Sequence, residues 1–272
     1  MKHFPQHYEK GDLVFFLHIP KTAGTSLTNA LTAAFPEEHT IQPAQINNAR
    51  KQDPLVFTEA DLLCGHYTHT VYSRRLLKQP GMVLTFLRNP VEHFVSTFFH
   101  LQFDPTFGYT IRLTGDKPAA EEFHAAIKDA TLEEFLAHPM SHLFTNFQTR
   151  YLVNGLSSDY KDLSDEALLP IAQRMLLDLP FFGLTERFDD SMALLDSVLD
   201  LPEPLQTIED NRSRNKPSDF VVPEELQREI HHRTAADQLL YQMAVLAFSA
   251  RYDAFTLAHQ SHPDASKASI SG

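Results

Sequence analysis

The sequence is poor in cysteine, in basic residues and in long apolar runs, and each scarcity excludes a class of protein. Its 272 residues include a single cysteine, Cys64, which rules out an internal disulfide framework and favours a reducing compartment. No apolar run reaches the roughly 20 residues that a membrane-spanning helix needs. The first residues, MKHFPQHYEKGD, lack the apolar centre and cleavage site of a signal peptide. We therefore predict a cytoplasmic protein without a membrane span.

Positive charge is also scarce. The chain carries 23 lysines and arginines against 35 acidic residues, for a formal net charge of −12. General attraction to nucleic acid or to an anionic membrane is therefore not expected. If the ligand is an anion, a few basic groups must be gathered around it in one place.

The first part of the chain alternates apolar β-forming runs with helical patterns. The run LVFFLHI (13–19) predicts a strand buried on both faces, and a helix is expected over 25–35. MVLTFLR (82–88) predicts a second strand, with Pro90 in the first turn of the following helix. A third strand is expected at 61–67. These units predict an α/β fold with a P-loop-like parallel sheet flanked by helices.

Beyond about residue 102 the pattern becomes mostly helical, so the C-terminal half is expected to consist mainly of helices. Thr131 and Glu134 form a plausible capping box at the start of one of them. We predict a single domain over residues 1–258 and a disordered tail over 259–272. Other expected elements are helices at 141–153, 164–179 and 223–252 and a short strand starting at 181.

The first strand runs into a turn of small residues, IPKTAGTSL. In a strand–loop–helix arrangement, the amides of Gly24, Thr25, Ser26 and Leu27 should point into the loop. The helix N-terminus there adds the positive end of a dipole. The backbone of this turn is therefore expected to hold an anion, although a plain strand-to-helix turn with Ser/Thr capping is the alternative.

Side chains of the same turn support the anion interpretation. Lys21 brings a mobile positive charge, while Thr22, Thr25 and Ser26 offer hydroxyl donors. The absence of a side chain at Gly24 allows the backbone to approach an anion closely. These residue types are common singly, and their ordered combination after a buried strand indicates a phosphate-like ligand.

The loop differs from the ATP-binding pattern G-x-x-x-x-G-K-[ST], because Lys21 precedes its only glycine, Gly24, by three residues. ATPases end a neighbouring strand in an aspartate that holds Mg²⁺, whereas MVLTFLR ends in Arg88. An arginine suits a second phosphate. Ser96 follows about two helical turns later and could bind the same phosphate. Alternatively, Arg88 pairs with Glu92 and Ser96 only fills space.

These two motifs resemble those of sulfotransferases that use 3′-phosphoadenosine 5′-phosphosulfate (PAPS). HIPKTAGTS resembles their 5′-phosphosulfate loop, and FLRNPVEHFVSTFF resembles their 3′-phosphate motif. CGHY, NFQTRYL (146–152) and GLTERFDDSMALL (183–195) are similar to segments of the carbohydrate (uronyl and heparan sulfate) 2-O-sulfotransferase family and its bacterial relatives. The resemblance covers most of residues 13–255. It implies transfer of a sulfuryl group from PAPS to an acceptor hydroxyl, expected on a carbohydrate, without a metal.

The resemblance also implies residue roles. The basic segment 209–218 would close over the 3′-phosphate end of the nucleotide, although an exposed basic loop is a fair alternative. The site could also include Gln148, Thr149 and Arg150. Alternatively, Arg150 pairs with an acid such as Glu186. The residues implied for the 5′-phosphosulfate are Lys21, Thr22, Gly24, Thr25, Ser26 and Leu27, and those for the 3′-phosphate are Arg88, Ser96, Arg212 and Ser213.

The resemblance assigns the general base to His66, in CGHYTH, with His69 as the nearby rival. A histidine suits proton removal near neutral pH. Lys21 would stabilise the departing phosphate oxygen. His66, His69 and Cys64 could instead begin a zinc site, but no second cluster at ligand spacing accompanies them.

Two other functions stay open at this point: an atypical P-loop kinase or ATPase, and a nucleotide-binding protein without catalytic activity on a sulfotransferase-like fold. The net charge of −12 leaves little basic surface for a polyanionic acceptor, so a neutral sugar, a lipid-linked glycan or a small metabolite fits as well. The aromatic residues of the 102–140 segment either pack in a core or line an acceptor cleft or lid. They are Phe103, Phe107, Tyr109, Phe123 and Phe135.

Overall fold

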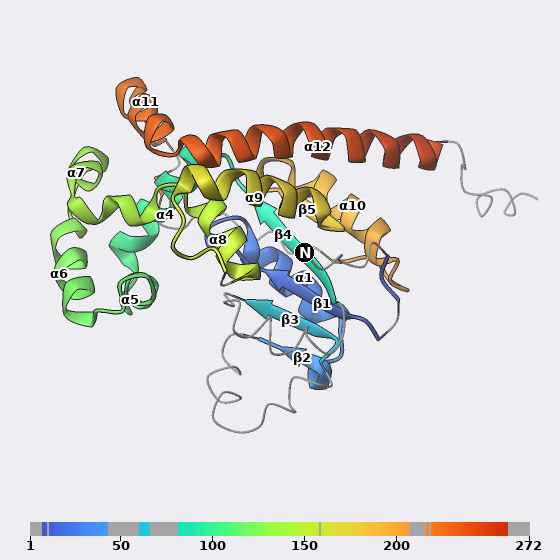
Figure 1. The fold of residues 1–272 in the computed structure, drawn as a ribbon. Helices are drawn as coiled ribbons and strands as arrows, with labels where there is room; N and C mark the ends of the chain where they lie inside the picture. The colour runs from blue at the N-terminus through green and yellow to red at the C-terminus, as the bar shows by residue number, and fades with distance from the viewer. Residues whose placement is uncertain are drawn as a thin grey trace, which may run out of the picture.

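The computed structural model describes residues 7–9, 11–42, 60–65, 81–157, 159–206, 216–217 and 219–260. A five-stranded, wholly parallel sheet lies at its centre, with strand order β2-β3-β1-β4-β5 (Figure 1). This confirms the predicted α/β class. The strands are β1 (Leu13–Leu17), β2 (Thr40–Ile41), β3 (Leu62–Gly65), β4 (Gly81–Leu87) and β5 (Phe181–Leu184).

Strand β1 is central and buried along its whole length, which explains its unbroken apolar sequence. Its last residue, Leu17, stands opposite Gly65 of β3 and Thr85 of β4. The Thr85 hydroxyl donates to the Leu17 carbonyl at 2.9 Å. The register therefore brings the carboxyl ends of these strands, and the loops that follow β1 and β4, to one edge of the sheet.

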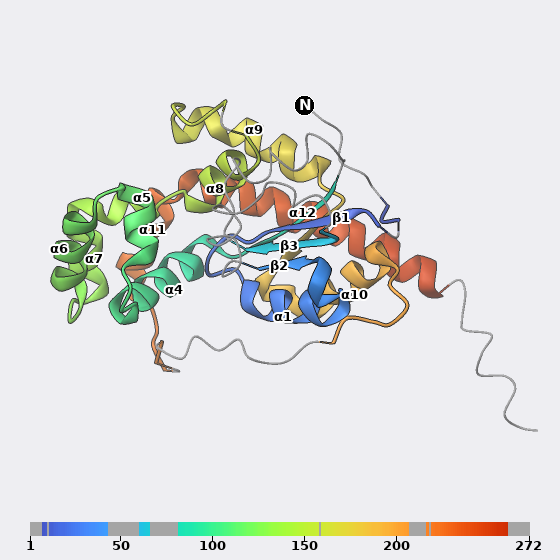
Figure 2. The same ribbon diagram turned by 90° about the horizontal axis from the view of Figure 1, so that it is seen from below.

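Helices cover both faces of the sheet. Figure 2 shows α1 and α10 on one face and α8 and α9 on the other. Helix α12 packs against β5, α9 and α10, along one side of the sheet. The bounds are α1 (Gly24–Ala34), α8 (Phe147–Leu156), α9 (Asp165–Asp178), α10 (Phe188–Leu199) and α12 (Ala235–Gln260).

A helical extension continues from the sheet's carboxyl edge, on the left of Figure 1. Aromatic side chains form its core, with Phe94 and Phe98 of α4 against Phe123, Phe135 and Phe144. Its elements are α4 (Pro90–Phe103), α5 (Gly108–Thr114), α6 (Lys117–Ile127), α7 (Leu132–Ala137), the 3-10 turn Pro139–Phe144 and α11 (Glu224–Arg233). Two further 3-10 turns span Glu37–His39 and Thr185–Arg187.

Core packing accounts for most of the aromatic residues in the 102–140 segment. Phe123 and Phe135 are fully buried and Tyr109 is nearly so, whereas Phe103 is 59% exposed. The predicted capping box is confirmed, because the Thr131 hydroxyl accepts from the Glu134 amide and the Glu134 carboxylate accepts from the Thr131 amide.

The predicted continuous helix over 141–153 is wrong. The 3-10 turn ends at Phe144, and α8 begins only after Asn146, which adopts a left-handed backbone (φ 46°). The physical reason is a long-range contact: the Asn146 side chain caps a distant helix, as described below. The expected helix at 223–252 is likewise divided, with Thr234 between α11 and α12.

Helix α12 continues to Gln260, and the predicted tail beyond it lies outside the described residues. The single-domain division stays a prediction. None of the described helices is both long and apolar enough to cross a membrane.

Candidate functional site

The loop after β1 has an unusual backbone. Lys21 (φ 69°) and Ala23 (φ 62°) both adopt left-handed conformations, which cost an L-residue roughly 1–2 kcal/mol each. Ala23 is the N-cap of α1 and provides no side-chain cap. The first-turn amides of Gly24, Thr25 and Ser26 therefore have no acceptor within the helix or from a cap. These are the amides that the sequence predicted to meet an anion.

Leu27 departs from that prediction. Its amide donates to the Ala23 carbonyl at 3.4 Å, and its side chain is fully buried. Its amide is thus the first of the intrahelical ladder of α1, and its side chain anchors the helix in the core.

Buried contacts of Thr22 and His18 hold the loop after β1 in place. The Thr22 hydroxyl donates to the Ile19 carbonyl at 2.7 Å, so its proton is committed to the loop itself and is not offered to a ligand as predicted. The His18 ring lies directly against Gly24, where a Cβ atom would fall 1.7 Å from His18 Nε2. Close packing, and not a positive φ, therefore requires glycine at position 24.

His93 of α4 supports the same loop from the neighbouring strand unit. The His93 ring nitrogen Nε2 lies 2.9 Å from the Pro20 carbonyl oxygen, and because a carbonyl only accepts, Nε2 must carry the proton. Burial lowers the pKa of His93 to about 3, with the charges of Arg88 and Lys21 adding to the effect. The neutral ring is thus a structural donor that ties α4 to the loop.

Lys21 and Arg88 meet at the carboxyl edge of the sheet. The Arg88 guanidinium NH1 donates to the Lys21 backbone carbonyl at 3.2 Å. Burial lowers the pKa of Lys21, and the positive charge of Arg88 lowers it further. Two cations from the ends of adjacent strands are therefore held together at one site, at a cost in mutual repulsion that an anion would relieve.

Several polar atoms of the residues that the motifs assign to phosphate binding are buried without a hydrogen-bond partner among the described residues. They are Ser26 Oγ, Ser96 Oγ and Arg88 Nε. A buried polar atom left without a partner costs about 1–3 kcal/mol. All three belong to residues that the motifs predicted to bind phosphate, and phosphate oxygens are acceptors that suit such donors.

Glu92 provides the alternative partner that the sequence left open for Arg88. Its carboxylate lies 3.6 Å from Arg88 NH2, and it also forms an ion pair of 2.9 Å with Lys216. Lys216 belongs to the basic segment 209–218, so this contact brings one end of that segment beside Arg88. The sequence analysis singled out Arg212 and Ser213 instead, and both lie outside the described residues.

The motif NFQTRYL divides into two parts. The side chain of Gln148 binds the backbone of Arg88, with Oε1 accepting from the Arg88 amide and Nε2 donating to the Arg88 carbonyl. Arg150 pairs with an acid, as one alternative held, but the acid is Asp165 at 3.4 Å and not Glu186. Glu186 instead accepts from the Asn89 amide and the Tyr241 hydroxyl.

The histidines proposed as base, His66 and His69, lie outside the described residues. Cys64, their possible partner in a metal site, is buried in β3, and burial raises the pKa of its thiol. Within the described ranges, no group of three His, Cys, Asp or Glu side chains is arranged to hold a metal ion. His100 is half-buried on α4, and burial together with the charge of Lys21 lowers its pKa.

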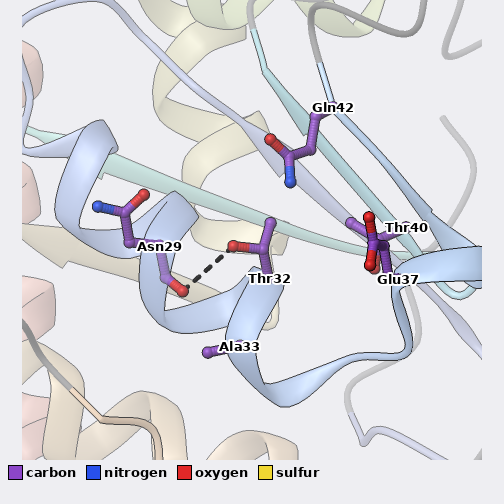
Figure 3. A pocket seen from close by; sticks show the side chains of 6 residues that line it. All are labelled: Asn29, Thr32, Ala33, Glu37, Thr40 and Gln42. Carbon is purple, nitrogen blue, oxygen red and sulfur yellow. Dashed lines mark hydrogen bonds between the residues drawn. The ribbon is translucent and has the colours of Figure 1, made fainter.

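A separate hollow of about 320 Å³ lies between α1 and the start of β2 (Figure 3). The Thr32 hydroxyl, which faces it, donates to the Asn29 carbonyl at 3.2 Å. None of the residues that line it is basic, and Glu37 would repel a phosphate, so it does not suit the nucleotide ends. Its lining residues are Asn29, Thr32, Ala33, Glu37, Thr40 and Gln42.

A known protein family matches most of the chain. The model of the sulfotransferase family matches residues 7–252. The chain belongs to the sulfotransferase family. The match includes the loop after β1, the α4 motif and the Gln148 segment.

Among known sulfotransferases, the chain is similar to heparan-sulfate 6-O-sulfotransferase 2 of mouse, with 24% identity over 93% of this chain and 46% of the mouse protein. The human protein of the same name is 24% identical over 89% of this chain and 45% of its own length. The chicken protein is 24% identical over 89% of this chain and 68% of its own length. The chain thus spans under half of the mouse and human relatives. They are named for 6-O transfer, whereas the motifs resembled the 2-O group.

A solved structure of mouse sulfotransferase SULT7A1 complexed with PAP is 12% identical in sequence to this chain. The two structures align over 86% of this chain and 68% of the mouse chain. Its TM-score of 0.34 is too low for any inference about the position of individual residues.

Proposed function

We propose that this family member is a PAPS-dependent O-sulfotransferase that transfers a sulfuryl group to a hydroxyl of a carbohydrate. The observation that carries the proposal is the hydrogen bond from Arg88 to the Lys21 carbonyl. It joins the two cationic strand ends into one site, as the binding of one ligand with two anionic ends requires. The family match supports the choice of PAPS over other nucleotides.

The two ends of the nucleotide would use different groups. The open amides of Gly24, Thr25 and Ser26, with Lys21, would bind the 5′-phosphosulfate at the N-terminus of α1. Arg88 and Ser96 would bind the 3′-phosphate, and their unpartnered buried donors support this assignment. Arg212 and Ser213 are added to the 3′ end by the resemblance alone.

In the proposed reaction, an acceptor oxygen bonds to sulfur while the bond between sulfur and the 5′-phosphate oxygen breaks. The acceptor proton passes to His66, the base implied by the family resemblance. Lys21 stabilises the negative charge that gathers on the departing phosphate oxygen. Its pKa is lowered by burial and by Arg88, yet a bound dianionic group would favour its protonated form.

The acceptor class is a carbohydrate. The names of the relatives indicate heparan sulfate as their acceptor, whereas the net charge of −12 favours an acceptor that needs little basic surface. A screen should therefore include both neutral and anionic sugars.

Transfer of labelled sulfate from PAPS to a panel of sugars tests the proposal. We expect transfer in the presence of a metal chelator, with release of 3′-phosphoadenosine 5′-phosphate (PAP). Phosphate transfer from ATP that needs magnesium would instead favour the kinase alternative. Tight PAP binding without transfer to any sugar would favour a nucleotide-binding protein without catalytic activity.

Replacing His66 tests the proposed base. His66→Ala should slow sulfate transfer by about 10²–10⁴-fold, the effect of losing a general base, while PAP binding stays near that of the wild type. His69→Ala is the matched control, because it removes the neighbouring histidine of the same motif. Near-normal transfer in His66→Ala together with a large loss in His69→Ala would reassign the role to His69.

A further inference from the structure

The N-termini of α8 and α12 meet and cap each other, although they are far apart in the sequence. The Asp237 carboxylate of α12 accepts from the amides of Gln148 (3.1 Å) and Thr149 (2.7 Å) and from the Thr149 hydroxyl (2.7 Å). In return, Asn146 Oδ1 accepts from the amides of Ala236 (3.0 Å) and Asp237 (3.2 Å). One buried carboxylate thus satisfies donors at the first turn of α8 and offsets two positive helix ends.

The side chain of Gln148 extends from this junction to the candidate site. Its Oε1 accepts from the Arg88 amide at 2.9 Å, and its Nε2 donates to the Arg88 carbonyl at 2.8 Å. Arg88 is the first residue after β4, where ladder pairing with the neighbouring strands ends at Leu87. Gln148 therefore replaces a strand partner and fixes the peptide planes on both sides of Arg88.

The direction of the Arg88 side chain depends strongly on that backbone clamp. Among the described residues, the guanidinium donates one hydrogen bond, to the Lys21 carbonyl, and forms a longer ion pair with Glu92 at 3.6 Å. The carboxylate of Glu186 also acts on it electrostatically, without an ion pair at contact distance. Its Nε is buried and has no partner in the described part of the chain. A guanidinium with a single short hydrogen bond to the described residues depends on its backbone for its direction. The side chain that holds this backbone, Gln148, is only 1% exposed.

We propose that Gln148, seated by Asp237, is a positioning residue that aims Arg88 at the 3′-phosphate and so determines selectivity for 3′-phosphorylated nucleotides. The proposal rests on the proposed function, because it assumes that Arg88 binds that phosphate. It assigns a role in substrate selection to the buried junction between α8 and α12.

The test compares two ligands, PAP and adenosine 5′-phosphate, which lacks the 3′-phosphate, by calorimetric titration of the whole 272-residue chain. In Gln148→Met, which keeps the length of the side chain and removes both hydrogen bonds, PAP should bind about tenfold more weakly. Adenosine 5′-phosphate should bind as it does to the wild type. In an Arg88→Ala background, Gln148→Met should change neither affinity further, because the residue acts only through Arg88.

Gln102→Met is the matched control. The side-chain Nε2 of Gln102 likewise donates to backbone carbonyls, those of Ile127 (3.0 Å) and Ala130 (2.9 Å). These contacts lie in the helical extension, away from Arg88. We expect it to lower thermal stability while leaving the ratio of the two affinities unchanged.

An unchanged affinity ratio in Gln148→Met would overturn the proposal and leave Gln148 with a purely structural role. If that variant does not fold, Gln148→Glu serves in its place, since it keeps the acceptor for the Arg88 amide and loses the donor to the carbonyl. A ratio equal to that of the wild type in Gln148→Glu would overturn the proposal equally. Failure of the wild type itself to bind PAP would instead refute the proposed function.

Discussion

The helices that follow β1 and β4 differ in how their N-termini are satisfied. Helix α1 begins after Ala23 with no side-chain cap, so its first amides stay open. Helix α4 begins with Pro90, which has no amide hydrogen, and Asn89 accepts from the amides of Val91 (3.0 Å) and Glu92 (3.3 Å). The first terminus is open to an anion and the second is closed.

This difference shows how a single ligand with two anionic ends could be divided between the two helices. At α1 the backbone would bind the anion, with Lys21 adding charge. At α4 only side chains, Arg88 and Ser96, are available. Changes that close the α1 terminus should therefore cost far more binding than changes that open the α4 terminus.

The strongest test of this contrast is Gly24→Ala. The added methyl group would fall on the His18 ring and displace the backbone whose open amides would bind the anion, so we expect PAP binding to weaken by roughly tenfold or more. Overpacking of this kind also typically costs about 1–3 kcal/mol of folding stability. Calorimetric titration with PAP measures the loss. In the double variant His18→Ala/Gly24→Ala the obstacle is gone, and much of the affinity should return. No recovery would mean that glycine is needed at position 24 for another reason.

A smaller effect is expected at His93, which links the two termini through the Pro20 carbonyl. Its pKa is lowered from 6.5 to about 3. Between these two pH values, His93 binds a proton in the unfolded chain and not in the folded chain. The free energy of unfolding should therefore fall by about 1.4 kcal/mol per pH unit from this group as the pH drops below 6.5. Urea unfolding between pH 7 and pH 4 should show a smaller decrease in the free energy of unfolding for His93→Gln than for the wild type.

Asp237 contributes in the opposite direction, because burial raises its pKa to about 6. Between about pH 4 and pH 6 its share of the stability falls as the pH rises. The comparison of His93→Gln with the wild type removes this common contribution. Identical pH profiles in the two proteins would show that His93 is not held neutral by the fold.

The smallest effect is expected for Asn89→Ala, which opens the α4 terminus. Loss of an N-cap should lower the free energy of unfolding by about 1 kcal/mol, while PAP affinity changes by less than about threefold. Thr131→Ala, which removes the cap of the distant α7, is the control for the stability effect. A tenfold loss of PAP affinity in Asn89→Ala alone would contradict the assignment of 3′ binding to side chains.

The sequence was sufficient for β1, β3, β4 and β5 and for the cations that follow β1 and β4, but it did not indicate the two-residue strand β2. The buried run of β1 and the terminal Arg88 of the second predicted strand are local patterns, so they could be read without the structure. The left-handed backbone at Lys21 and Ala23 could not be predicted, because neither residue type favours it.

Long-range contacts account for the rest of what the sequence did not reveal. Gln148 binds a backbone 60 residues away, and Asp237 caps a helix 89 residues away from itself. The same junction explains the break before α8 that the sequence pattern missed. No periodicity or spacing within a local window contains such information, since it depends on which helix ends the fold brings together.

The central claim is that Lys21 and Arg88 bind opposite ends of one nucleotide. It is tested most directly by measuring two ligands, each with one of the two phosphates, on two variants. Affinities of adenosine 5′-phosphate and adenosine 3′-phosphate are measured for the wild type, Lys21→Ala and Arg88→Ala. We predict that Lys21→Ala loses affinity for the 5′-phosphate and keeps it for the 3′-phosphate, and that Arg88→Ala does the reverse. Equal losses for both ligands in both variants, or no loss in either, would contradict the claim.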